Sequence, residues 1–147
     1  MAQRVLRAEV AVQGRAAVAI GRGLCVFAAV GQGDGAADVT YLADKLAHLR
    51  VFPGVDSGRM TASLLQAGGE MLLIPQFTLY GDVRRGRRPD FGAAAPPGEG
   101  AALLEALAVA LRGHGVPLRQ GIFGADMLVA VDGDGPVTIL LDSRRAF

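Results

Sequence analysis

A chain of 147 residues, 51% of them hydrophobic, has the size of one domain over 1–147, with an aliphatic core that lacks tryptophan. Its net charge of +1 excludes a protein that binds polyanions over its whole surface, so nucleic-acid contact would need a local patch. The single cysteine, Cys25, excludes an internal disulfide and a structural zinc site built on cysteines. Neither a signal peptide nor an apolar run of about 18 residues is visible, so we expect a cytoplasmic protein with no membrane partner.

The first half of the chain alternates between strand and helix patterns. Residues 3–12 alternate in polarity and are followed by the apolar stretch 16–20, which together predict a β-hairpin. The continuous apolar run 24–30 predicts a buried strand, and apolar residues at three- and four-residue spacing predict a helix over 36–50. A further short buried strand is predicted at 71–74, after a pair of glycines.

The second half begins with a long loop. Residues 81–100 are dominated by Gly, Arg and Pro, which is typical of a functional loop within a compact domain. A second helix is predicted over 101–112, followed by two strands at 127–131 and 137–141 that are separated by a Gly- and Asp-rich turn. This order predicts one α/β domain with a mixed or largely antiparallel sheet and two main helices.

The usual catalytic sets are absent from the sequence. His48 and His114 fall near helix ends, no G-x-S-x-G turn presents a serine, and Cys25 lies in an apolar run that predicts a buried thiol. Metal ligands do not cluster, and no nucleotide-binding glycine loop follows a strand, so we expect neither a metal nor a cofactor. An enzyme with this sequence would therefore work through main-chain donors and the groups of its substrate.

Three segments are candidates for a site, and each has a purely structural alternative. Residues 75–79, Pro-Gln-Phe-Thr-Leu, place polar groups at the end of a buried strand or else form a strand edge that proline blocks from pairing. Residues 135–138, Gly-Pro-Val-Thr, form an ordinary turn or place rigid carbonyls in a pocket. Residues 84–88 are the third segment, which either binds phosphates or is merely a solvated surface. Its basic residues are Arg84, Arg85, Arg87 and Arg88.

These segments resemble the D-aminoacyl-tRNA deacylase family, and the resemblance covers nearly the whole chain. Several short motifs occur in the family's order and at compatible spacing, which is more specific than any one of them. The matching segments are 3–5, 41–45, 49–50, 76–80, 86–89 with 91, 94–97, 123–125, 135–138 and 141–143.

The resemblance implies a barrel-like sheet, a homodimer and an activity in chiral proofreading of translation. The reaction would be hydrolysis of the ester that joins a D-amino acid to the 3′ end of tRNA, and also of glycine mischarged on tRNA-Ala. The ribose 2′-hydroxyl of the substrate would assist, with Thr78 as a nucleophile in an alternative mechanism. The residues carried over are Gln76, Phe77 and Thr78 at the reaction centre; Gly135 and Pro136, with a cis bond, as the chirality filter that reaches into the other subunit; Arg4 as its brace; Phe123 and Met127 in the substrate pocket; and the four arginines on tRNA.

Two departures from the family pattern leave alternatives open. Pro75 stands where the family has Ser, and Gly133 stands where it has Asn. Proline removes both a hydroxyl and an N–H, and glycine holds a loop less firmly. The alternatives are a deacylase of relaxed specificity, or a homologue that binds tRNA with little turnover.

Overall fold

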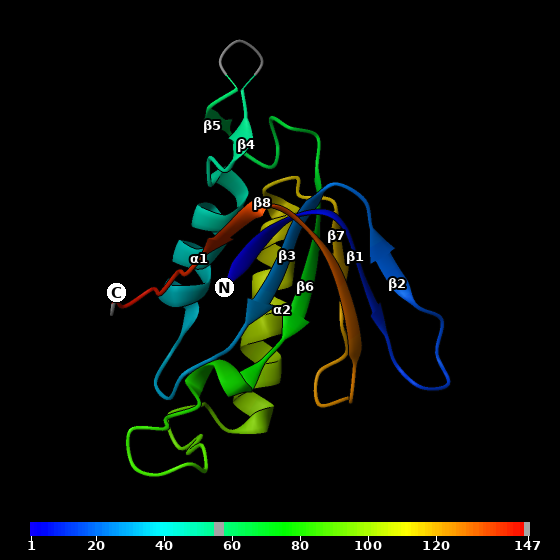
Figure 1. The fold of residues 1–147 in the computed structure, drawn as a ribbon. Coiled ribbons are helices and arrows are strands. Elements are labelled where there is room, and N and C mark those ends of the chain that lie inside the picture. The colour runs from blue at the N-terminus through cyan, green and yellow to red at the C-terminus, as the bar shows by residue number, and fades with distance from the viewer. Residues whose placement is uncertain (55–57, 146–147) are drawn as a thin grey trace.

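The computed structural model describes residues 1–54 and 58–145 (Figure 1). Its elements in chain order are β1 (Ala2–Ala11), β2 (Val18–Ile20), β3 (Gly23–Ala28), α1 (Ala36–His48), β4 (Phe52–Pro53), β5 (Met60–Ala62), β6 (Glu70–Pro75), the 3-10 helix η1 (Phe77–Tyr80), α2 (Pro97–Gly113), β7 (Leu118–Gln120) and β8 (Leu128–Ile139).

Most strands belong to one mixed sheet. Its order is β2-β1-β3-β6-β7, and β8 also pairs with β1. The pairs made by β1 are antiparallel, whereas β3, β6 and β7 run parallel to one another. Each parallel step passes through a helix, α1 or α2, as parallel neighbours require. The predicted α/β class with a mixed sheet and two main helices is therefore confirmed.

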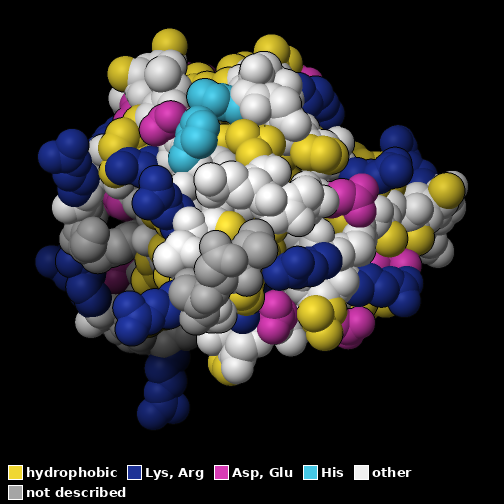
Figure 2. Space-filling view, turned by 90° about the horizontal axis from the view of Figure 1, so that it is seen from above, with side chains coloured by type: hydrophobic (Ala, Val, Ile, Leu, Met, Phe, Trp, Pro, Cys, Tyr) yellow, Lys and Arg dark blue, Asp and Glu magenta, His cyan; other side chains and the backbone are white. Residues whose placement is uncertain are grey.

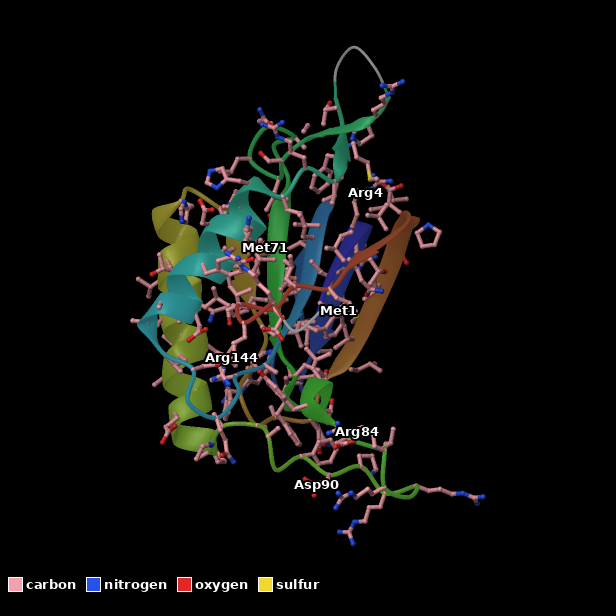
Figure 3. The ribbon with its side chains drawn as sticks, turned by 90° about the vertical axis from the view of Figure 1, so that its left-hand side faces the viewer. Met1, Arg4, Met71, Arg84, Asp90 and Arg144 are labelled. Carbon is pink, nitrogen blue, oxygen red and sulfur yellow. The ribbon has the colours of Figure 1, made fainter. Side chains whose placement is uncertain are left out.

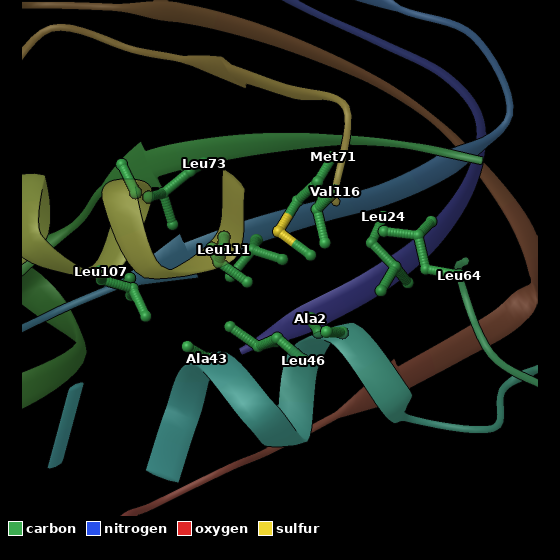
Figure 4. Close-up of a cluster of buried hydrophobic side chains, with 14 of the residues drawn as sticks. Ala2, Leu24, Ala43, Leu46, Leu64, Met71, Leu73, Leu107, Leu111 and Val116 are labelled. Carbon is green, nitrogen blue, oxygen red and sulfur yellow. The ribbon is translucent and has the colours of Figure 1, made fainter. Parts of the chain in front are cut away.

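The sheet curls, so that β2 approaches β7 and the sheet is nearly closed into a barrel. Both surfaces of its central strands are buried, since successive side chains of a strand point to opposite faces. Leu24 and Leu73 face the core that α1 and α2 cover, shown in Figure 4. Cys25 and Leu72 face a second core inside the curve of the sheet. Burial on both faces explains why β3 and β6 are continuous apolar runs in the sequence.

The structure corrects the sequence prediction at the C-terminal strands. Two strands separated by a turn were expected over 127–141, but β8 is one strand that pairs with β1 over most of its length. Residues 132–136 lie within this ladder, which has register shifts there, rather than in a turn between strands. Helix α2 begins at Pro97, a residue suited to a first helical turn, so the preceding loop is shorter than predicted.

The short strands β4, β5 and β7 were not predicted, because two or three residues carry no readable periodicity. No helix in the described part of the chain is long and apolar enough to span a membrane.

Candidate active site

The end of β6 delivers Gln76, Phe77 and Thr78 to one edge of the sheet. The Gln76 N–H still belongs to the sheet, because it donates to the Ala28 carbonyl at 2.8 Å. The chain then enters η1, none of whose residues is buried. The Gln76 side-chain amide donates a hydrogen bond to the Thr78 hydroxyl, so these two residues form one polar group at the strand end.

The first two N–H groups of η1 have no acceptor in the part of the chain that the structure describes. Within residues 1–54 and 58–145, nothing accepts a hydrogen bond from the N–H of Phe77 or Thr78, as expected at the start of a helix. The turn itself is closed further on, where Leu79 N–H donates to the Gln76 carbonyl at 3.2 Å and Gly81 N–H donates to the Thr78 carbonyl at 3.0 Å. Two adjacent free donors in a closed turn are suited to stabilise an oxyanion.

Pro75 ends the hydrogen bonding of β6 on the side that faces β7. The N–H of Gln76 points toward β3, and neighbouring residues of a strand alternate in direction, so the Pro75 nitrogen faces the β7 side. Strand β7 has already ended at Gln120 there. The strand-edge role of Pro75 and a polar site at Gln76 are therefore compatible, because the Gln76 N–H still pairs with β3.

Met127 lies beside this strand end. Gly121 N–H donates to the Leu73 carbonyl at 2.9 Å and continues the ladder beyond β7. A Cβ built on Gly121 would lie 2.8 Å from the Met127 sulfur and 3.5 Å from Pro75 Cδ. Gly121 thus leaves room for Met127 next to Pro75, a role that no pattern in the sequence indicates.

Phe123 packs against the start of α2. Its ring lies 3.5 Å from the position of a Cβ built on Gly100, and the side chain is 40% exposed. The loop 121–127 therefore brings both predicted pocket residues, Phe123 and Met127, to the edge of the sheet where β6 ends.

Gly135 and Pro136 form a bulge in β8. On β1, only Arg4 lies between Gln3, which pairs with Thr138, and Val5, which pairs with Gly133. Four residues of β8 span the same interval. The Gly135-Pro136 peptide bond is cis, as the resemblance implied.

Arg4, the predicted brace, contacts this bulge. Its side chain is largely buried, Nη1 donates to the Val51 carbonyl at 2.6 Å, and Nε lies 2.9 Å from Asp134 Oδ2. A Cβ built on Gly135 would lie 3.3 Å from Arg4 Nη2. Nothing in the sequence indicates these contacts of Asp134 and Val51 with Arg4, because neither contact is local in sequence.

A single chain does not bring the bulge and the β6 end together. Arg4 pairs with Leu24 near the start of β3, whereas Gln76 bonds to Ala28 at its end. Leu24 and Ala28 are four residues apart on β3, which corresponds to about 13 Å along the strand. Figure 3 shows Arg4 and Arg84, which follows η1, toward opposite ends of the sheet.

The predicted basic residues lie on a hairpin, which we define as residues 82–90. Its ends are joined by two main-chain hydrogen bonds between Asp82 and Asp90, of 2.8 and 2.9 Å. Arg84 binds Asp82 through Nε and Nη2, and this hydrogen bonding lowers the pKa of the Asp82 carboxyl to about 2. The other three arginines, Arg85, Arg87 and Arg88, are exposed. Most of the hairpin's positive charge is therefore available to a ligand.

Arg144 does not add a free charge to the hairpin. Its Nη2 donates to Asp34 Oδ1 at 2.6 Å and to the Gln32 carbonyl at 2.8 Å. Asp34 is only 11% exposed in its side chain and also accepts the Gly31 N–H at 2.7 Å. The guanidinium therefore fastens the C-terminal segment to the start of the α1 region.

The remaining reactive side chains lie away from the β6 end. Burial raises the pKa of the Cys25 thiol to about 12. His48 and His114 form an edge-to-face pair with ring centroids 5.4 Å apart. Figure 2 shows both rings, in cyan, on the surface viewed from the β4–β5 end, opposite η1 in Figure 1. Among the described residues, no group of three His, Cys, Asp or Glu side chains is placed to hold a metal ion.

The fold and these contacts define a class of small α/β protein whose candidate reaction centre consists of main-chain donors at a strand end. The model of the family described as D-Tyr-tRNA(Tyr) deacylase matches residues 1–142. The chain belongs to this family, so the resemblance found in the sequence is confirmed.

Curated relatives align along nearly their whole length. The chain is 50% identical over 142 residues to a D-aminoacyl-tRNA deacylase of Heliobacterium modesticaldum, covering 97% of this chain and 94% of the relative. It is 52% identical over 145 residues to the D-aminoacyl-tRNA deacylase of Anaeromyxobacter dehalogenans, with 99% and 97% covered. The corresponding protein of Roseiflexus castenholzii is 55% identical over 141 residues, with 96% and 89% covered.

Two solved structures share the fold. The c-Myc DNA unwinding element binding protein superposes with a TM-score of 0.89 at 35% identity, over 96% of this chain and 95% of that one. A structure described as a probable eukaryotic D-amino acid tRNA deacylase has a TM-score of 0.76 at 20% identity, with 92% and 93% covered. At that identity the second structure shows the fold alone.

Proposed function

We propose that this chain hydrolyses the ester bond between a D-amino acid and the 3′-terminal ribose of tRNA. The curated relatives described above are D-aminoacyl-tRNA deacylases, and the alignment with them is nearly complete. One observation in the structure carries the proposal: the N–H groups of Phe77 and Thr78 have no acceptor among the described residues. An ester hydrolase needs such donors for the oxyanion that forms during acyl transfer.

In the proposed reaction, water attacks the ester carbonyl carbon, and the carbonyl oxygen becomes an oxyanion that accepts hydrogen bonds from Phe77 and Thr78. The bond from this carbon to the ribose oxygen then breaks. The ribose oxygen takes the proton that water gave up, relayed by the neighbouring 2′-hydroxyl of the substrate. The products are the free amino acid and tRNA with its 3′-hydroxyl restored, so no protein nucleophile is consumed.

We propose that chirality is tested in a homodimer, by Gly135 and Pro136 of the second chain. Within one chain the bulge lies about 13 Å along the sheet from the β6 end, which supports a filter supplied by a second copy. Large apolar side chains on β1 and β8 support such an interface, since Leu6 is 59% exposed and Leu128 is 77% exposed.

The hairpin 82–90 would hold the tRNA backbone. Its arginines contact phosphates without reading sequence, so they contribute affinity and orientation rather than selectivity for one tRNA. Because aminoacyl-tRNA is the substrate, we place the activity in the cytoplasm with translation.

A relaxed deacylase is the second candidate, and two positions favour it. Pro75, whose ring lies near Met127, offers no hydroxyl to the site. A Cβ built on Gly133 would have no neighbouring atom within 4 Å, so nothing packs against this position to support the adjacent bulge. Such an enzyme would also cleave glycyl-tRNA-Ala or a small L-aminoacyl ester.

The test is deacylation of D-tyrosyl-tRNA, L-tyrosyl-tRNA and glycyl-tRNA-Ala by the purified full chain, each against buffer. Fast loss of the D-ester with the L-ester at the buffer rate is expected. Loss of both tyrosyl esters at similar rates would replace strict selectivity with the relaxed deacylase. If no ester is lost above buffer while tRNA still binds, the chain is a tRNA-binding homologue and hydrolysis is overturned.

A further inference from the structure

Phe91 contacts the turn that carries the two free N–H groups. Its ring packs edge-to-face on Phe77, with centroids 5.1 Å apart and planes at 72°. The Phe77 side chain is 56% exposed, and no residue of η1 is buried. Only half-buried Tyr80, at the end of the turn, anchors it through a side chain of its own, so contacts from outside the turn help decide where the Phe77 and Thr78 N–H groups point.

The same ring reaches the far end of the turn. A Cβ built on Gly81 would lie 3.1 Å from Phe91 Cε1 and 3.0 Å from the Thr78 carbonyl oxygen. Only a residue without a side chain allows the ring to come this close to the main chain after Thr78. Phe91 thus touches the turn at its beginning, through Phe77, and at its end, through Gly81.

The main chain of Phe91 is fixed by hydrogen bonds outside η1. It follows Asp90, which closes the base of the hairpin through main-chain bonds to Asp82. Its carbonyl accepts the Ala94 N–H at 3.0 Å. The main chain of Phe91 is therefore held by the hairpin base and by the segment leading to α2, while its ring packs on η1.

We infer that Phe91 is a positioning residue that aims the Phe77 and Thr78 N–H groups at the reacting carbonyl. The inference rests on the proposed function. The hairpin remains closed by main-chain bonds when the ring is removed, so Phe91 acts on the rate of hydrolysis and not on tRNA affinity.

The experiment compares Phe91→Leu and Phe91→Ala with wild type, using the full chain and D-tyrosyl-tRNA. We expect kcat to fall about tenfold in Phe91→Leu and further in Phe91→Ala. The fall in Phe91→Leu is smaller than the roughly hundredfold fall caused by losing one oxyanion donor, because the donors are misaligned rather than removed. KM, and the Kd for uncharged tRNA, should change by less than about threefold, since phosphate contacts are untouched. Tyr41→Leu on α1 is the matched control, an aromatic substitution away from the turn, and should keep wild-type kcat.

Hydrogen exchange provides a readout that does not need turnover. The amides of Leu79 and Gly81, bonded within the turn, should exchange about tenfold faster in Phe91→Ala while core amides keep their protection. Unchanged kcat and unchanged exchange in a folded Phe91→Ala protein would overturn the inference. An inactive wild type would instead overturn the proposed function, and the exchange rates alone would then decide whether Phe91 orders the turn.

Discussion

Arg4 and Asp134 face each other across the bulge in β8, with Arg4 Nε 2.9 Å from Asp134 Oδ2. The geometry is that of an ion pair without a directed hydrogen bond from Nε. The same guanidinium donates to the Val51 carbonyl just after α1. Because Asp134 directly precedes Gly135, this guanidinium ties the candidate filter to the body of the fold.

Asp134→Asn should relax chiral selectivity, because it removes the charge that holds Arg4 and keeps the shape of the side chain. A partly exposed ion pair contributes about 1 kcal/mol, which corresponds to about a fivefold fall in the ratio of D- to L-tyrosyl-tRNA hydrolysis. The control is Asp132→Asn, an aspartate on the same strand that makes no ion pair with Arg4. Equal ratios in the two variants would contradict the brace.

Gly135→Ala should destabilise the bulge, whereas Gly133→Ala should not. Gly135 has a φ of +123°, and a Cβ there would lie 2.8 Å from Val137 Cγ2, while Gly133 has nothing within 4 Å. We expect a loss of about 1–3 kcal/mol in the free energy of unfolding for Gly135→Ala. Gly133→Ala should be neutral or slightly stabilising. Urea unfolding of both variants checks this, and equal midpoints would refute it.

Thr78→Val separates the main-chain mechanism from a threonine nucleophile. The Thr78 hydroxyl accepts a hydrogen bond from Gln76, but the N–H of both Phe77 and Thr78 survives the substitution. If main-chain donors stabilise the oxyanion, kcat should fall by less than about tenfold, well below the loss of a donor. A collapse of kcat to the buffer rate would instead make the hydroxyl the nucleophile.

Replacing Arg87 and Arg88 by Ser should weaken tRNA binding uniformly. Removing one arginine–phosphate interaction should reduce the slope of log K against log salt concentration by about 1. Titration of uncharged tRNA at several salt concentrations measures this slope. Arg119→Ser, an exposed arginine on β7, serves as the control. An unchanged slope in the hairpin variant would show that the hairpin is only a solvated surface.

The Cys25 thiol should make stability fall at alkaline pH. Its pKa is raised from 9.0 to about 12 by burial, so between these values the unfolded chain has lost a proton that the folded chain retains. The free energy of unfolding should therefore decrease by up to about 1.4 kcal/mol per pH unit above pH 9. Cys25→Ala should remove this part of the pH dependence, and an identical alkaline slope in that variant would argue against it.

Much of the fold was readable from the sequence because its signals are local. The apolar runs of β3 and β6 reflect burial on both faces. The helical spacing in α1 and α2 reflects one covered face each. The reaction-centre segment was found through the family resemblance, since Gln76, Phe77 and Thr78 by themselves also fit an ordinary strand end.

The rest depended on contacts between distant residues. The Gly- and Asp-rich segment before Pro136 has the local chemistry of a turn, and only pairing with β1 makes it a bulge inside one strand. The partnership of Arg4 with Asp134 spans nearly the whole chain. The ring contact of Phe91 with Phe77 depends on how the hairpin folds back. None of these has a periodicity or spacing that a sequence pattern shows.

The distance between the bulge and the β6 end has a genetic consequence in the proposed homodimer. Each chain would contribute the N–H donors to one site and the chirality filter to the other. A chain in which only the η1 turn is disrupted and a chain damaged only at Gly135 would then pair to form one site with both lesions and one with neither. Two defective alleles would complement each other in the same cell, and a carrier of both would still proofread through the intact site of each mixed dimer.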